Sequence, residues 1–187
     1  MEMTLELPDD TEIMRRVHAG HGDLVGLLFD RHHRPVYGFF INLTHEPTLS
    51  EDLTQEVFLR VLRYAQSFKE GSAFRPWLFR IARNVLTDHQ NRLRPLAQLH
   101  EAIHIPEPGP SAQVEAEAAA DHEQLSQALA KLTLEKRELL LLSRDPDMSS
   151  QDLAGIYGCT SSALKVRVHR ALNELRSHFF QRQEVTP

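Results

Sequence analysis

Residues 50–94 have the sequence SEDLTQEVFLRVLRYAQSFKEGSAFRPWLFRIARNVLTDHQNRLR, and the pattern of this segment is the strongest indication of the fold. Val57 and Val61 in its first half, and Ile81 and Val85 in its second, belong to apolar series that recur every three or four residues. This spacing is typical of amphipathic helices that bury one face. The stretch therefore predicts two helices separated by a short glycine-containing loop.

The two predicted helices differ in charge. The first mixes acidic and basic residues, and Thr48–Glu51 predicts a capping box at its start. The second helix and the residues after it carry Arg75, Arg80, Arg83, Arg92 and Arg94, opposed only by Asp88. Because phosphates are bound by Lys and Arg, we expect the second helix to meet a polyanion and the first to meet a protein.

Composition and charge narrow the possible classes of protein. The 187-residue chain has a net charge of −5. Residues 31–95 nevertheless contain ten basic and six acidic residues, whereas residues 96–121 contain no basic and five acidic residues. An acidic surplus outside the basic helices predicts weak DNA binding without a partner. The single cysteine, Cys159, excludes an internal disulfide framework, and no apolar run approaches the length of a membrane span. These features predict a cytoplasmic protein without a membrane segment of its own.

The pattern along the chain predicts four parts. Residues 1–22 are interpreted as an N-terminal extension without an assigned function, and residues 23–94 as a helical domain with one long helix, or two, around its proline at position 35. Residues 95–121 lose basic charge and regular patterning, which indicates a linker. Helical patterning returns over residues 122–187. The predicted fold class is all-α, with two small helical domains joined by a proline-containing acidic linker.

The C-terminal part shows the pattern of a helix-turn-helix. Ser149–Asp152 predicts a helix cap, Gly158–Thr160 a turn, and the last helix is expected to run from Ser161 to about Phe180. The predicted core face of that helix comprises Leu164, Val168, Ala171 and Leu175. The opposite face comprises Ser162, Lys165, Val166, His169 and Asn173, with Arg167, Arg170 and Arg176 beside it.

Such an outward face can bind the major groove of DNA. Lys165, Val166 and His169 are predicted to contact base edges, and Arg167 and Arg170 to bind phosphate. The alternative is a solvated basic helix, which the preceding turn makes less attractive.

Asp52–Phe58, Phe68 and Trp77–Asn84 form one ordered series, and Leu164–Leu172 form a second. Together they resemble a known family, the extracytoplasmic-function sigma factors of bacterial RNA polymerase. The series that resembles sigma region two consists of Asp52–Phe58, Phe68 and Trp77–Asn84. The series that resembles sigma region four is Leu164–Leu172, in which Val166 and Leu172 depart from the common pattern. These departures mean that a promoter preference cannot be transferred from the family.

The resemblance implies three interfaces. Contacts to core RNA polymerase are assigned to Asp52, Gln55, Glu56 and Leu59. The alternative interpretation of these residues is a polar helix face that is only solvated. Contacts to the minus-ten element are assigned to Phe68, Lys69, Arg80, Arg83, Asn84, Thr87 and Asp88, with Phe68 stacking on a base and Asn84 reading one. The alternative for the loop is a simple interhelical turn. Contacts to the minus-thirty-five element are assigned to Ser162, Lys165, Val166, Arg167, His169 and Arg170.

The resemblance also implies the function and the partners. The chain is expected to be a transcription initiation factor that binds core polymerase and promoter DNA. The resemblance implies that it is not an enzyme, and it is expected to have no catalytic residues, metal or cofactor. An anti-sigma factor is expected as a further partner, because members of this family are commonly held inactive by one.

Two other functions are weighed against this one. A stand-alone helix-turn-helix regulator would bind an operator without polymerase and would need a dimerisation surface. A zinc metalloprotease is suggested by His100–His104, which satisfies the H-E-x-x-H motif. That string lies between prolines in the predicted linker, without a packed scaffold or an evident third ligand, so incidental linker residues are the preferred interpretation.

Overall fold

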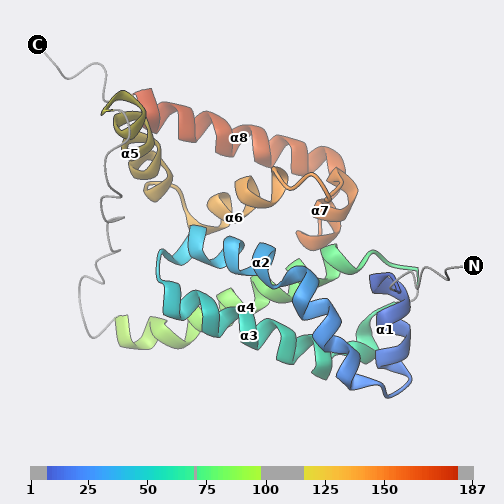
Figure 1. Ribbon diagram of the computed structural model, residues 1–187. Helices are drawn as coiled ribbons and strands as arrows, with labels where there is room; N and C mark the ends of the chain where they lie inside the picture. The colour runs from blue at the N-terminus through green and yellow to red at the C-terminus, as the bar shows by residue number, and fades with distance from the viewer. Residues whose placement is uncertain (1–7, 70, 98–115, 181–187) are drawn as a thin grey trace, which may run out of the picture. The chain divides into compact units, whose positions relative to one another are not determined.

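The computed structural model describes residues 8–69, 71–97 and 116–180, and every regular element in these ranges is a helix (Figure 1). The chain divides into two compact units, Met1–Ile103 and His104–Pro187. The predicted all-α fold class is confirmed.

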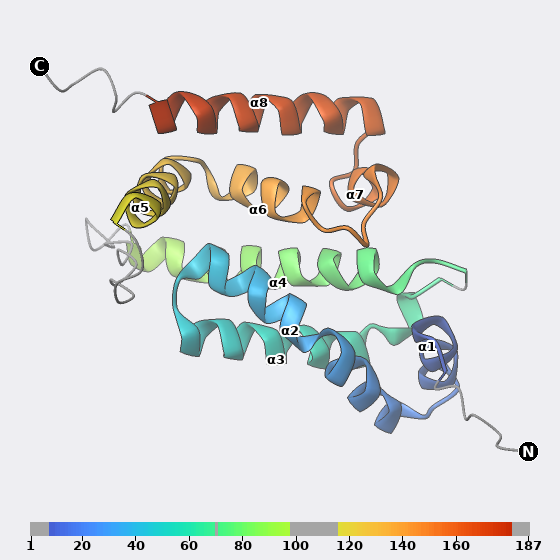
Figure 2. The ribbon, with the colours of Figure 1, turned by 45° about the horizontal axis from the view of Figure 1, so that its top comes forward.

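The N-terminal unit is a bundle in which α3 packs against both α2 and α4 (Figure 2). Its elements are α1 (Asp10–His18), η1 (Gly22–Leu24), α2 (Val25–Thr44), α3 (Pro47–Arg63), η2 (Ala65–Ser67) and α4 (Phe74–Ala97). Phe29 of α2 meets Phe58 of α3 edge to face at 5.0 Å, and Phe39 of α2 meets Phe79 of α4 at 5.6 Å. These ring pairs join the three long helices around a core in which Phe40 is completely buried.

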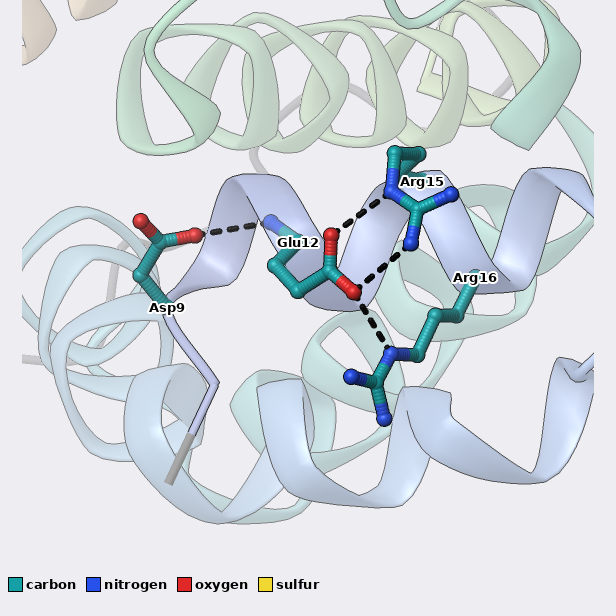
Figure 3. A network of polar contacts seen from close by, with 4 residues as sticks. All are labelled: Asp9, Glu12, Arg15 and Arg16. Carbon is teal, nitrogen blue, oxygen red and sulfur yellow. Dashed lines mark hydrogen bonds and ion pairs between the residues drawn. The ribbon is translucent and has the colours of Figure 1, made fainter. Parts of the chain in front are cut away.

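The α1 helix is part of this core and is not a free extension. Asp9 caps it by accepting a hydrogen bond from the Glu12 backbone N–H at 2.7 Å, and Glu12 pairs with Arg15 and Arg16 on its outer face (Figure 3). Its inner face consists of Ile13, Met14 and Val17, which are 0, 1 and 6% exposed. The sequence did not predict this docking, because three apolar residues in nine make only a short stripe.

Polar contacts also hold α1 against α2. Asp10 lies 2.6 Å from Nε2 of His32 and accepts a hydrogen bond from Nη1 of Arg31 at 2.9 Å. The hydrogen bond with His32, together with Arg31, keeps the pKa of Asp10 below its usual value despite partial burial. Asp10 therefore stays ionised and joins the two helices over the neutral pH range.

The starts and turns of the central helices differ in part from the sequence prediction. The α2 helix continues through Pro35 as one helix, which settles the alternative left open. The α3 helix begins at Pro47, a residue whose fixed φ suits the first helical position, so the capping box predicted at Thr48–Glu51 is wrong. Ser50 is instead buried inside the first turns, where its hydroxyl donates to the Glu46 carbonyl oxygen at 2.7 Å.

The C-terminal unit is organised by one long helix. It contains α5 (Ala116–Ala130), α6 (Leu134–Ser143), α7 (Ser150–Ile156) and α8 (Ser161–Phe180), and α8 packs against each of the other three. The predicted cap at the start of α7 is present as a capping box, with Ser149 and Asp152 each bonding the other's backbone N–H. Gly158 makes the following turn with a φ of 60°, a conformation that favours glycine.

The described helices reach into both ends of the predicted linker. The α4 helix continues to Ala97 and α5 already begins at Ala116. The remaining linker residues, including the His100–His104 string, lie outside the described residues.

We expect Ile13→Ala to lower the free energy of unfolding by about 2–4 kcal/mol, because it leaves a cavity where α1 meets the bundle. Chemical denaturation followed by circular dichroism measures the change. The matched surface variant on the same helix is Arg16→Ala, which removes only an exposed i,i+4 ion pair and should cost less than about 0.5 kcal/mol. Equal effects of the two variants would mean that α1 is not docked.

Candidate polymerase and nucleic-acid interfaces

The α3 helix has one buried face and one face that is open to a partner. Leu53, Val57 and Val61 are at most 4% exposed and pack in the bundle. On the other side the structure brings together the predicted polymerase set of Asp52, Gln55, Glu56 and Leu59, all at least partly exposed. Leu59 is 58% exposed and Leu62, one turn later, is 48% exposed, so this side of α3 also offers apolar surface to a partner.

Arg60 connects this α3 face with α4. Its Nε donates to Oε1 of Glu56 at 2.8 Å, and its Nη1 donates to Oδ2 of Asp88 at 2.6 Å. Arg60 is not among the residues that the sequence predicts for either interface. The i,i+4 spacing to Glu56 could have indicated the first pair, but Asp88 lies 28 residues further along the chain.

The loop between α3 and α4 holds Phe68 differently from the prediction. The Phe68 side chain is only 6% exposed, and its ring lies edge to face with Trp77 at 5.3 Å and with Phe74 at 6.1 Å. The predicted stacking of Phe68 on a base is therefore corrected, because the ring already packs in the core and anchors the loop. Lys69 is exposed beside it, and Gly71 adopts a φ of 79° with open space around its Cα.

The α4 helix presents a polar face beyond its buried one. Leu78, Ala82 and Val85 are completely buried. The exposed and half-exposed side chains include the remaining predicted minus-ten residues Arg80, Arg83, Asn84, Thr87 and Asp88. The Thr87 hydroxyl donates to the Arg83 carbonyl oxygen at 2.9 Å, so it offers a partner only its lone pairs.

The α8 helix separates into the two faces that its spacing predicted. Leu164 and Ala171 are 2 and 1% exposed, and Val168 and Leu175 pack against the Leu132, Leu140 and Ala171 cluster. The exposed side chains comprise the whole predicted minus-thirty-five set of Ser162, Lys165, Val166, Arg167, His169 and Arg170. Val166 is 49% exposed, which leaves its methyl groups free to contact an apolar group such as a thymine methyl.

The same face of α8 contains one contact between neighbouring polar side chains. The amide nitrogen of Asn173 lies 3.3 Å from Nδ1 of His169, one turn earlier. Lys136 of α6 forms an ion pair with Glu174, which holds the acidic side chain of α8 on the side of the helix that faces α6. The outward face is therefore predominantly basic.

Comparison with known proteins decides the family. The model for Sigma-70 region 2 matches residues 28–95, and the model for Sigma-70 region 4 matches residues 122–175. The RNA polymerase sigma factor CarQ of Myxococcus xanthus is 30% identical over 166 residues, which cover 87% of this chain and 93% of that protein. Further relatives over most of the chain are named ECF, that is extracytoplasmic-function, RNA polymerase sigma factors. The chain belongs to the ECF sigma factors.

A further relative in sequence and a solved structure similar to this ECF sigma factor are also sigma factors. The ECF RNA polymerase sigma factor EcfG of Rhodopseudomonas palustris is 34% identical over 141 residues, covering 73% of this chain and 75% of that protein. The co-crystal structure of the sigma factor RpoE in complex with the anti-sigma factor NepR from Bartonella quintana superposes with a TM-score of 0.66 at 26% identity, covering 87% of this chain and 98% of that one.

Membership of the family establishes the function. The chain is an RNA polymerase sigma factor for transcription initiation, which binds core polymerase and promoter DNA and is not an enzyme. The family thus decides against both the stand-alone regulator and the metalloprotease. In the described parts of the chain no three His, Cys, Asp or Glu residues are grouped to hold a metal ion, and no helix there is long and apolar enough to cross a membrane.

Proposed function

We propose that the exposed α3 face is the surface by which this sigma factor docks on core polymerase. The observation that carries the proposal is the joint exposure of Asp52, Gln55, Glu56 and Leu59 on one side of a helix whose other side is buried. A central apolar residue surrounded by polar ones is the usual composition of a protein interface. Leu59 supplies the apolar centre, and Asp52 supplies charge complementarity to a basic partner, since Glu56 is already paired with Arg60.

The proposed minus-ten interface consists of the α4 face and the loop before it. Lys69, Arg80 and Arg83 supply phosphate contacts, Thr87 offers an acceptor, and Asn84 reads a base through an amide that both donates and accepts. Asp88 lies beside this surface, but Arg60 engages its Oδ2, and we do not propose a base contact for it. Phe68 supports the loop from within the core.

The proposed minus-thirty-five interface is the outward face of α8. Lys165, Val166 and His169 would contact base edges in the major groove, while Arg167 and Arg170 bind the flanking phosphates. Ser162, near the start of the helix, suits a further backbone contact, because hydroxyls and helix N-termini commonly bind phosphate there.

Two tethered DNA contacts explain how a chain of net charge −5 can act on DNA. Each contact is weak alone, and each raises the effective concentration of the other once polymerase sets their spacing. We propose two domains, an N-terminal one that includes α1 and one that begins near residue 122, joined by an acidic linker. Because chromosome and polymerase share the bacterial cytoplasm, we place the protein there.

An anti-sigma factor is the proposed inhibitor. The structurally similar RpoE is in complex with the anti-sigma factor NepR. We infer that a protein of this kind controls the present chain by covering its polymerase-binding face, where the exposed Leu59 offers apolar surface.

Asn84→Ala tests the minus-ten interface. Promoter DNA is first identified by sequencing the DNA that the protein binds together with core polymerase, and run-off transcription from that DNA confirms initiation. We expect Asn84→Ala to weaken binding of the melted minus-ten strand by the holoenzyme about tenfold, since one good base contact is lost. Fluorescence anisotropy of a labelled single strand measures it. Asn42→Ala makes the same chemical change at an exposed site on α2 and should bind like the unaltered protein.

A further inference from the structure

Arg60 forms ion pairs both within the polymerase-facing helix α3, with Glu56, and across to the DNA-facing helix α4, with Asp88. Its side chain is only 16% exposed, although it carries a full charge. The guanidinium is planar with its donors in fixed directions, so the bond from Nε to Glu56 orients the group. Nη1 is then aimed across to Asp88 on α4.

Asp88 is the one acidic residue in the sequence of α4. The helix otherwise carries Arg75, Arg80, Arg83, Arg92 and Arg94. Asp88 follows Asn84 by four residues and thus lies on the same face one turn later. Its side chain is 52% exposed, so its carboxylate lies next to the proposed path of the DNA.

We propose that Arg60 is a positioning residue for promoter DNA, which neutralises Asp88 and holds its carboxylate so that the α4 face can accept the melted strand. The proposal rests on the minus-ten interface proposed above. It also joins the two interfaces physically, since the guanidinium that holds Asp88 is oriented by Glu56 of the polymerase-binding set.

The electrostatics support this role. An uncompensated carboxylate near the phosphate path repels the strand over about 8 Å at physiological ionic strength. Partial burial lowers the pKa of Arg60, but hydrogen bonds to Glu56 and Asp88 more than offset this and raise the pKa above its ordinary value. Arg60 therefore carries its charge at neutral pH and can offset the charge of Asp88 there.

A double-mutant cycle with holoenzyme and the labelled minus-ten strand tests the proposal. We expect Arg60→Met to weaken strand binding about three- to tenfold at low salt, because the Asp88 charge is released. Asp88→Asn alone should bind at least as tightly as the unaltered protein. In the double variant, binding should stay within about twofold of Asp88→Asn, because the α4 face then carries no carboxylate and the remaining partner of Arg60, Glu56, lies on α3.

Matched controls separate positioning from a simple loss of charge. Arg63→Met removes the same charge from an exposed site on α3 and should change strand binding less than about twofold. Arg60→Lys retains the charge but lacks the planar guanidinium that reaches both carboxylates. Its affinity for the minus-ten strand is expected to lie between those of the unaltered protein and Arg60→Met. Core binding and the unfolding temperature are measured in parallel, so that strand affinity is compared only among folded, polymerase-bound variants.

The outcomes are distinct. If the double variant is as weak as Arg60→Met, Arg60 acts by contacting DNA or by general stability, and the proposal is wrong. If Arg60→Met does not fold, the proposal rests on Arg60→Lys, whose defect must vanish in the Asp88→Asn background. A normal Asn84→Ala variant would instead contradict the minus-ten interface itself, so the two failures are distinguishable.

Discussion

Asp52→Lys is expected to reduce the affinity of this sigma factor for core polymerase by on the order of a hundredfold. The side chain is exposed on the α3 face together with Gln55 and Leu59. Reversing its charge replaces an attraction to a basic partner by a repulsion, and like charges facing each other across an interface cost several kcal/mol. Anisotropy of labelled protein titrated with purified core polymerase measures the affinity.

The matched control is Asp30→Lys, which makes the same change at an exposed site on α2 and should leave core affinity within about twofold. Both variants should unfold at nearly the same temperature as the unaltered protein, since exposed substitutions usually change stability by less than about 0.5 kcal/mol. Equal losses for both would indicate that net charge, and not the α3 face, controls docking.

Lys165→Glu is expected to reduce holoenzyme binding to a promoter duplex that contains the minus-thirty-five element by roughly a hundredfold at low salt. Lys165 lies exposed on α8 between Leu164 of the core and Val166 of the outward face. Its replacement removes a donor to a base edge and places a carboxylate in the major groove. Gel-shift titrations at several salt concentrations would show both the lower affinity and a smaller dependence on salt.

Lys131→Glu provides the control for this variant, because it makes the same charge change on an exposed residue of the C-terminal unit outside α8. It should weaken duplex binding less than about threefold. Neither variant should alter binding of the melted minus-ten strand, which the N-terminal unit contacts. A Lys165→Glu variant with normal duplex binding would exclude α8 as the recognition helix.

Much of the fold follows from periodicity in the sequence. Apolar residues at spacings of three and four predicted the helices of residues 50–94 and 149–180. The same spacing predicted the burial of Leu164 and Ala171 on α8. In a helix the face of a residue depends only on its position along the chain, so sequence spacing suffices to separate core from surface. The local cap at Ser149 was predictable for the same reason, because its partner Asp152 lies three residues away.

The helices, their faces and the family all follow from residue spacing and ordered motifs, which are properties of the sequence. Which side chains from different segments contact one another depends on the tertiary structure. It placed Phe68 in the core, docked α1 through Ile13, and brought Arg60 to Asp88. The docking of α1 and the Arg60–Asp88 pair join elements distant in the chain, and whether two such elements meet depends on how the helices cross, which periodicity does not specify. The burial of Phe68 against Phe74 and Trp77 depends on the path of the loop, which periodicity does not specify either.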